Sequence, residues 1–295
     1  GNPFDVTAAY ALINALERSW GVHSALGGTG AIVTAMVNLL AERGVAVRCQ
    51  APVTRIRIEG GRACGVVLEN GESIDADIVV SNGDTAWTYK NLVPAEHRRV
   101  WTDRKIARGK YSMGLFVWYF GTSHRYEEVP HHMMVLGPRY QGLLHDIFKR
   151  QHLADDFSLY LHRPSATDPG VAPAGCDTFY ALSPVPHLDS GTDWAAFGET
   201  YRERIAQALE ASVLPGLRQH IVTSRINTPQ MFHDRLWSHK GAGFGLEPLL
   251  TQSAWFRPHN RSEDIPGLYM VGAGTHPGAG VPGVLMSAKA LQSVV

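Results

Sequence analysis

A glycine-rich segment near the C-terminal end has the residue types needed to hold a nucleotide-type cofactor. An apolar run, Leu268–Val271, leads into Gly272-Ala273-Gly274, and further glycines follow at positions 278, 280 and 283. Glycine has no Cβ and tolerates positive φ, and the free N–H groups at the start of a helix attract anions. The segment therefore predicts a strand, then a turn that brings bare backbone close to a ligand, then a helix.

Gly278, Gly280 and Gly283 also match the G-x-G-x-x-G pattern of dinucleotide sites. That pattern requires a following helix, a second strand and an acidic residue about 20 positions further on. The sequence reaches Val295 before these elements can follow. We therefore do not expect this turn to be the primary pyrophosphate site. A glycine-rich packing turn without any ligand is the alternative interpretation.

The composition excludes several other functions. The 295 residues contain 27 lysines plus arginines and 27 aspartates plus glutamates, so no overall charge favours nucleic acid. Fourteen histidines are present, but none are arranged as H-E-x-x-H or H-x-x-x-H, and we expect no metal site. The spacings of His124, His131, His132, His162, His187 and His259 all lack these patterns.

The cysteines and the apolar runs predict the cellular setting. Cys49, Cys64 and Cys176 are odd in number and show no C-x-x-C spacing, which is typical of a reducing, cytoplasmic compartment. No apolar run is long enough to cross a bilayer, and the first residues do not resemble a signal peptide. The sequence starts without methionine, so we expect it to be a piece of a longer protein.

The first 85 residues predict two helices followed by a small meander. Apolar side chains recur at helical spacing over 7–20 and again after Gly27-Gly28-Thr29-Gly30, and we expect both stripes to face a core. Strand-like runs follow at 45–49, 53–58 and 65–68, with Asn70-Gly71 as a hairpin turn. The apolar run 76–82 predicts a buried parallel strand, and Asp84 is placed to cap the next helix.

The middle of the chain differs in character. It predicts strands at 113–120, 157–161 and 178–182, and an amphipathic helix at 202–213. We expect a fold of the α/β class, in which part of a Rossmann-like cofactor-binding domain with a small antiparallel meander is joined to an α+β substrate domain with a mixed or antiparallel sheet. The expected segments are 1–24 (substrate-domain helix), 25–85 (partial cofactor-binding domain), 86–264 (substrate domain) and 265–295 (C-terminal segment of the cofactor-binding domain).

These motifs occur in an order that resembles the downstream half of FAD-dependent oxidoreductases of the amine-oxidase and carotenoid-desaturase superfamily. Five further blocks sharpen the resemblance toward bacterial phytoene desaturases, the lycopene-forming flavoenzymes. The blocks are Gly1-Asn2-Pro3-Phe4, Gly137-Pro138-Arg139-Tyr140, residues 156–162, Pro184-Val185-Pro186-His187-Leu188 and residues 250–260.

The resemblance implies FAD as cofactor and assigns positions to it. It implies that Val53 meets the adenine side through its backbone. Gly272, Ala273 and Gly274 would approach the pyrophosphate and ribityl chain, and Gly280, Val281 and Pro282 would lie under the isoalloxazine. The first dinucleotide-binding unit of the family has no counterpart here, so we expect this chain alone to bind FAD poorly. No catalytic residue is assigned, because the family's acid and base positions belong upstream of Gly1.

The implied substrate is phytoene with its desaturation intermediates, and the implied electron acceptor is oxygen or a quinone. A polyene offers no hydrogen-bonding group, so an apolar tunnel must bind it. The aromatic strand Phe116–Phe120 and the run Met133–Leu136 are candidates for its walls, although core packing explains both equally well. Residues 142–153 are a candidate interfacial helix for a peripheral contact with the inner face of the cell membrane, with an ordinary packed surface helix as the alternative.

Two other functions stay open at this stage. An amine oxidase usually has a turn that closes in Gly-Asp, whereas residues 272–283 contain no acid. A non-catalytic binder of apolar ligands, or an inactive fragment, is the other alternative.

Overall fold

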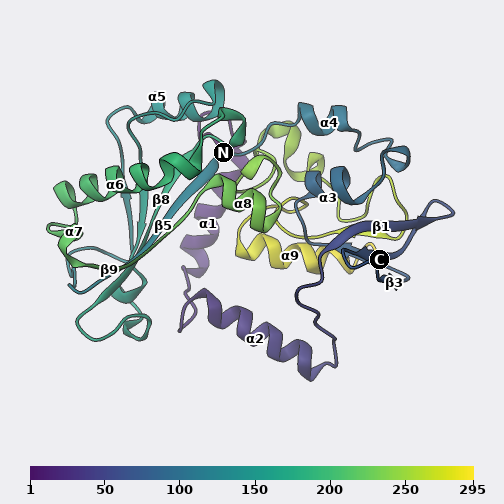
Figure 1. Cartoon of the computed structure of the whole chain (residues 1–295), viewed down its shortest axis with the longest axis horizontal. Helices are drawn as coiled ribbons and strands as arrows, with labels where there is room; N and C mark the ends of the chain where they lie inside the picture. Colours follow the sequence, from purple (N-terminus) through teal and green to yellow (C-terminus); the bar gives the residue numbers. More distant parts are fainter. The chain divides into compact units, whose positions relative to one another are not determined.

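The computed structural model describes residues 1–295, apart from the side chain of Ala9 (Figure 1). The chain divides into two compact units. Unit 1 contains Gly1–Ala9, Arg48–Met113 and Met231–Val295, and unit 2 contains Tyr10–Val47 and Gly114–Gln230. The chain therefore passes from unit 1 to unit 2 and back again two times.

Unit 1 begins with the predicted meander. Strands β1 (Val53–Glu59), β2 (Arg62–Leu68) and β3 (Ser73–Asp75) form an antiparallel sheet in that order. Between β2 and β3, Gly71 has φ +85°, the left-handed conformation that the Asn70-Gly71 turn requires. The meander and its hairpin are confirmed, but residues 45–49 form no strand. Alternation over five residues is not enough where no neighbouring strand pairs with the segment.

A second, parallel pair carries the two loops of interest. Strand β4 (Val79–Ser81) pairs with β10 (Leu268–Met270), which confirms the predicted buried parallel strand. Helix α3 (Thr85–Leu92) follows β4, and helix α9 (Val281–Leu291) follows β10 after the glycine-rich turn. The remaining α-helices are α4 (Asp103–Arg108), within unit 1, and α8 (Pro229–Leu236), most of which lies in unit 1.

The core of unit 1 is built around these strands. Ile56, Leu268 and Met270 are at most 2% exposed, and the Tyr89 and Trp101 rings stack with centroids 5.3 Å apart. Tyr89 also shares a hydrogen bond of 2.8 Å with the Ser262 hydroxyl. Burial of these side chains fixes the strand pair, and so the position of the loops that follow it.

Unit 2 is organised by a five-stranded antiparallel sheet with the strand order β6-β7-β8-β5-β9 (Figure 1). The antiparallel alternative of the predicted substrate domain is thus confirmed. The strands are β5 (Gly114–Thr122), β6 (His132–Val135), β7 (Leu159–His162), β8 (Asp177–Val185) and β9 (Ile221–Asn227).

Helix α6 (Trp194–Ser212) packs its apolar side chains on one face of this sheet. Tyr201 of α6 meets the Phe116 ring edge-on at 4.9 Å and shares a hydrogen bond of 2.8 Å with Ser183. The helix begins eight residues earlier than the sequence predicts, because Asp193 accepts hydrogen bonds from Ala195 and Ala196 and caps its N-terminus. Shorter helices are α5 (Tyr140–His145) and α7 (Leu217–His220).

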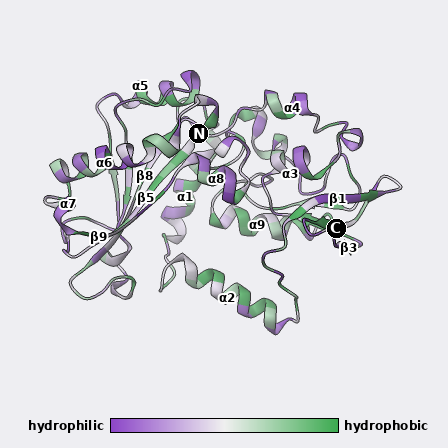
Figure 2. Ribbon diagram, in the orientation of Figure 1, coloured by the Kyte–Doolittle hydropathy of each residue, from purple (hydrophilic) through white to green (hydrophobic). Residues whose placement is uncertain are grey.

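Helices α1 (Ala11–Trp20) and α2 (Thr29–Glu42) form where the sequence predicts them, but their apolar stripes are not core faces. Neither helix has a buried residue among those described, and Trp20 of α1 and Val33 of α2 are 72% and 62% exposed. Figure 2 shows the apolar character of α2 along its length. The expectation of buried stripes is wrong here, because helical spacing reports an amphipathic helix but not what covers it.

The two units also divide the chain differently from the expected segments. Residues 86–113 and 231–264 belong to unit 1, and residues 25–47 belong to unit 2. Compact units are not the same as functional domains, so the expected domains 1–24, 25–85, 86–264 and 265–295 stay a prediction. None of the helices in the described part of the chain combines the length and apolar character needed to cross a bilayer.

Candidate functional site

The parallel pair of unit 1 brings two distant loops to one edge. Leu268 pairs with Val79 and Met270 with Ser81, so the residues after β4 and those after β10 leave the strands together. In open α/β sheets ligands bind beyond the carboxyl ends of parallel strands. This edge is therefore where the glycine-rich turn would meet a cofactor.

Gly272 and Gly274 are required by packing against the β4 loop. A Cβ on Gly272, which has φ +97°, would collide with Oδ1 of Asn82. A Cβ on Gly274 would lie 2.7 Å from the Thr85 hydroxyl. These glycines thus let two loops nest together, which is a structural reason that the sequence did not suggest. Their contact with a cofactor, and that of half-buried Ala273, stays a prediction.

Gly280 is different, because the space beside it is open. It has φ +99°, is exposed, and a Cβ there would meet no described atom within 4 Å. Val281 and Pro282, the first residues of α9, are also exposed. Gly280 thus offers bare backbone next to the start of α9, which leaves room for a flat ring to approach.

Two buried side chains hold the turn in shape. The guanidinium of Arg257, a residue 3% exposed, donates to the carbonyl oxygens of Thr275 at 3.2 Å and Ala273 at 2.6 Å. The amide of Asn260 donates to the carbonyls of Met270 at 3.1 Å and His276 at 3.0 Å. Both clamps lie in the block 250–260, which sequence reasoning used only for its resemblance. The sequence feature that could have indicated these two roles is a single arginine and an asparagine within an aromatic, proline-containing run.

Asp84 stands at the end of the β4 loop, as predicted. Its carboxylate accepts a hydrogen bond of 2.9 Å from the Trp87 N–H and caps α3. Desolvation raises the pKa of this carboxyl, and N–H donors and the charge of Arg257 oppose that rise. A small cavity beside it is lined by Thr85, Gly245 and Gly274, among others.

Val53 is placed at the start of β1, half-buried, and packs against the core of unit 1. Its backbone role toward adenine remains a prediction. Pro52, its neighbour, accepts a hydrogen bond from the Glu69 N–H at 2.9 Å. The packing of Val53 against the core accounts for an apolar residue at this position.

The sheet of unit 2 has two faces with different uses. Phe116, Trp118 and Phe120 are at most 2% exposed and belong to the core. Because they are buried, these three side chains cannot line a substrate tunnel. Tyr119, 42% exposed, lies on the opposite face, which we call the outer face. Strand alternation separates these neighbours, since successive side chains point to opposite faces.

The outer face is lined with aromatic rings. Tyr180 lies with its centroid 5.8 Å from that of Tyr119, 5.6 Å from Tyr160 and 4.6 Å from His162. On the edge strand β6, Met134 is 63% exposed and pairs with Tyr160, whereas Met133 packs against the core. Half of the run 133–136 is therefore core and half lies on the outer face.

The candidate interfacial helix is a packed segment in which α5 ends at His145 and a π-helical turn follows over Asp146–Arg150. Leu143, Leu144 and Ile147 of residues 142–153 are at most 7% exposed. Asp146, also buried, accepts a hydrogen bond of 3.0 Å from Arg150. The apolar side chains exist but turn inward, which favours the packed alternative over the interfacial one for these residues.

Three histidines that are separate in sequence meet at the end of β6 and β7. The rings of His131 and His162 have Nε2 atoms 2.9 Å apart, and His132 pairs across the strands with His162. Burial and the neighbouring imidazoles lower the pKa of His162 to about 4, and burial also lowers the pKa of His131. Sequence spacing missed this cluster because its members come from two strands. The expectation of no metal site is untested.

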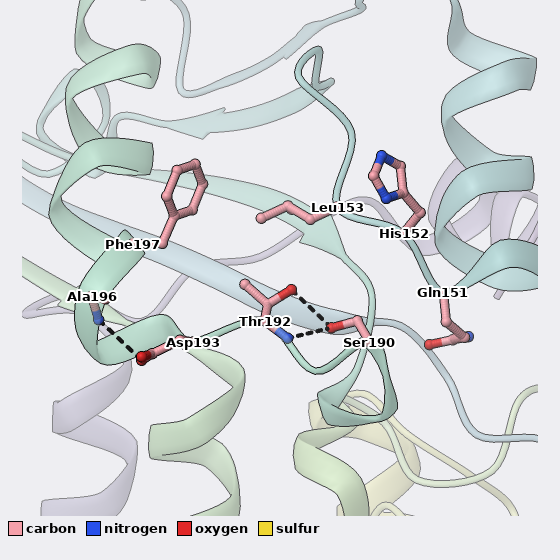
Figure 3. Close-up of a pocket in the computed structure, with 8 residues that line it drawn as sticks. All are labelled: Gln151, His152, Leu153, Ser190, Thr192, Asp193, Ala196 and Phe197. Carbon is pink, nitrogen blue, oxygen red and sulfur yellow. Dashed lines mark hydrogen bonds between the residues drawn. The ribbon is translucent and has the colours of Figure 1, made fainter.

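A groove of about 420 Å³ lies beside the start of α6, between residues 151–153 and 190–197 (Figure 3). On one wall the polar groups bond within the local turn: the Ser190 and Thr192 hydroxyls are 2.9 Å apart, and Asp193 caps the helix. Phe197 and Leu153 pack against the sheet core.

Two curated proteins are similar to this chain over almost its whole length. The chain is 51% identical over 296 residues to a phytoene desaturase (neurosporene-forming) of Cereibacter sphaeroides, covering 99% of this chain and 57% of that protein. It is 50% identical over 298 residues to a phytoene desaturase (lycopene-forming) of Pseudescherichia vulneris, covering 100% and 60%. The chain therefore spans about three fifths of the length of these relatives.

Solved structures show the same fold at low identity. An oxidoreductase from Methanosarcina mazei matches with a TM-score of 0.62 at 19% identity, covering 91% of this chain and 55% of that one. A putrescine oxidase variant matches with a TM-score of 0.58 at 12% identity, covering 91% and 52%. The family model described as flavin containing amine oxidoreductase matches residues 1–290. The chain belongs to the flavin-containing amine oxidoreductase family.

Proposed function

We propose that the protein is an FAD-dependent phytoene desaturase acting toward lycopene. The observation that carries the proposal is the open space beside Gly280, at the end of a turn that Arg257 and Asn260 clamp. The names of the two relatives quoted above support the substrate, and they differ in the product, neurosporene or lycopene.

The residues of this chain divide the work of holding FAD. Gly280, Val281 and Pro282 would support the ring, Gly272–Gly274 would face the pyrophosphate and ribityl chain, and Val53 the adenine side. The N–H of Gly272 already donates to Ser287, so Gly272 would meet the cofactor without supplying a hydrogen bond from that group. Bound FAD supplies the two-electron acceptor for hydride, which no side chain provides. The proton from the adjacent carbon leaves to a base that this chain does not identify.

The outer face of unit 2 supplies the apolar surface for a polyene. Tyr119, Tyr160 and Tyr180 place neighbouring aromatic rings on this face, and the substrate has no polar group to pair with their hydroxyls. Burial of hydrocarbon against such a surface contributes roughly 25 cal/mol per Å². The core residues Phe116, Trp118 and Phe120 shape this face from behind without touching substrate.

The proposal includes contact with the inner face of the cell membrane, since phytoene dissolves in lipid. This part rests on the substrate's chemistry alone, because Leu143, Leu144 and Ile147 are buried. Oxygen or a quinone would reoxidise the flavin. Flotation of the protein with liposomes tests the membrane contact, and failure to float would remove it without affecting the desaturase proposal.

Reconstitution tests the activity. The protein is expressed from its complete reading frame, loaded with FAD, and incubated with liposomes that contain phytoene. We expect coloured polyenes on extraction, and their chain of conjugated double bonds identifies the product. A protein that holds FAD and yields no coloured product contradicts the proposal.

The cofactor site is tested separately with Gly280→Val. The added side chain would enter the open space beside the turn, so we expect loss of flavin absorbance. Gly71→Val is the matched control, because Gly71 also has positive φ, at +85°, and open space around it, yet lies in the β2–β3 hairpin. Equal flavin content in the two variants contradicts the assignment of Gly280.

The two alternatives give different results in the same assay. An amine oxidase would oxidise amines and leave phytoene unchanged, and the turn's lack of an acidic residue between Gly272 and Gly283 disfavours it. A non-catalytic binder would retain phytoene on the outer face without reducing flavin. Anaerobic flavin bleaching by phytoene therefore separates the desaturase from both.

A further inference from the structure

The histidine cluster of unit 2 lies outside the cofactor turn and the strands' core face. His132 is the first residue of β6, His131 directly precedes it, and His162 ends β7. One ring nitrogen from each histidine lies within 4.8 Å of the other two. Three neutral imidazoles at this separation are the donor set of many zinc sites.

Hydrogen bonds fix the orientation of two of the rings. His131 Nδ1 lies 2.6 Å from the Thr167 hydroxyl, and His132 Nδ1 lies in hydrogen-bond contact with the Tyr160 hydroxyl. Both contacts occupy Nδ1 and leave Nε2 for another partner. Metal-bound histidines show this arrangement, in which the second nitrogen is held by a neighbouring group.

The third ring, that of His162, lies next to the ring of His131. Nε2 of His162 is 2.9 Å from Nε2 of His131, and the two ring centroids are 4.7 Å apart. An ion at the usual Zn–N distance of about 2.0–2.1 Å from both nitrogens fits between them after only small ring rotations. Without an ion, a single shared proton must join these two nitrogens.

We propose that His131, His132 and His162 form a binding site for a divalent transition-metal ion of the zinc type, through their Nε2 atoms, with water in the fourth position. Nitrogen-only ligands favour zinc, copper and nickel over magnesium or calcium. The bound ion would cross-link β6, the edge strand, to β7. This inference does not depend on the proposed desaturase activity.

Titration calorimetry with Zn²⁺ tests the site. The untagged, flavin-loaded protein from the complete reading frame is first treated with a chelator. We expect one equivalent of Zn²⁺ to bind with micromolar or tighter affinity. No binding up to millimolar Zn²⁺, or binding that is unchanged in His162→Ala, overturns the proposal.

Variants separate ligands from neighbours. His132→Ala alters an exposed side chain, so folding is kept, and we expect binding to weaken at least about 100-fold. Thr167→Val and Tyr160→Phe should weaken it by about 10-fold, because they remove only the groups that orient the rings. Equal affinity in His132→Ala and wild type contradicts the assignment.

The matched control is His124→Ala. His124 and His220 form another ring pair in unit 2, with centroids 4.9 Å apart, but among the described residues no third ligand-type side chain completes a metal-binding group with them. We expect wild-type zinc affinity in this variant. A loss equal to that of His132→Ala would mean that zinc binds histidines on the surface without selecting this site. In that case the proposal fails.

Discussion

Ser287 of helix α9 accepts a hydrogen bond of 2.8 Å from the backbone N–H of Gly272, the first glycine of the turn. The same hydroxyl donates to the carbonyl of Val284, so one fully buried side chain joins the helix to the start of the turn. Gly272 and Ser287 lie on opposite sides of the glycine-rich segment in the sequence, so local sequence patterns do not indicate this hydrogen bond. The turn is therefore held from both of its ends.

We expect Ser287→Ala to lower the free energy of unfolding by about 1–3 kcal/mol, since the Gly272 N–H would be left buried without a partner. Ser293→Ala is the control, because Ser293 also donates to a backbone carbonyl, that of Ala290, but is exposed. Urea unfolding measures both. Equal midpoints for the two variants would contradict the role of Ser287.

The buried Arg257 is the second target. In Arg257→Met the carbonyls of Ala273 and Thr275 lose their shared donor, so we expect a loss of at least about 2 kcal/mol in stability. We also expect weaker FAD retention by the protein from the complete reading frame, measured by flavin absorbance after dialysis. Arg62→Met is the control, since the exposed Arg62 bonds only to the Asp77 carbonyl. Flavin retention that is equal in both variants would contradict the clamp.

Local chemistry made much of this site predictable. The strand at Leu268–Met270, the glycines that follow it and the helix from Val281 all have signals within a few residues. Asp84 was predicted as a helix cap for the same reason, and the structure confirms it. Such features depend on short-range propensity, which a single sequence expresses directly.

Features that depend on distant partners were not predictable. Whether Trp118 or Tyr119 faces the core depends on which side α6 packs, and the stripes of α1 and α2 carry no record of their neighbours. His132 meets His162 only through the register of β6 and β7. The sequence holds the residues of that cluster, but strand pairing creates it.

The outer face of unit 2 gives a third prediction. Tyr119→Ser removes one ring from the face, so we expect KM for phytoene to rise by about 10-fold, from the loss of roughly 50 Å² of apolar contact. Stability should change little, since Tyr119 is 42% exposed. Tyr140→Ser is the control, because Tyr140 is 38% exposed but lies on α5. An equal change in KM for both variants would remove the outer face from the substrate site.

Asp84 gives a prediction about pH. Desolvation raises the pKa of its carboxyl above 3.8, so the folded state holds the proton to higher pH than the unfolded state. The wild type should therefore lose stability, relative to Asp84→Asn, as pH rises from below 3.8 through the raised folded pKa. Arg257 and the N–H of Trp87 face this carboxyl and limit the effect.

Two variants separate charge from capping at Asp84. Asparagine caps helices as well as aspartate, so at pH 7 we expect Asp84→Asn to be at least as stable as the wild type. Asp84→Ala removes the acceptor for the Trp87 N–H and should cost about 1 kcal/mol. Urea unfolding at pH 3.5 and pH 7 measures both effects. If Asp84→Asn is less stable than the wild type at pH 7 by as much as Asp84→Ala, the ionised carboxylate stabilises the fold and the pKa assignment is wrong.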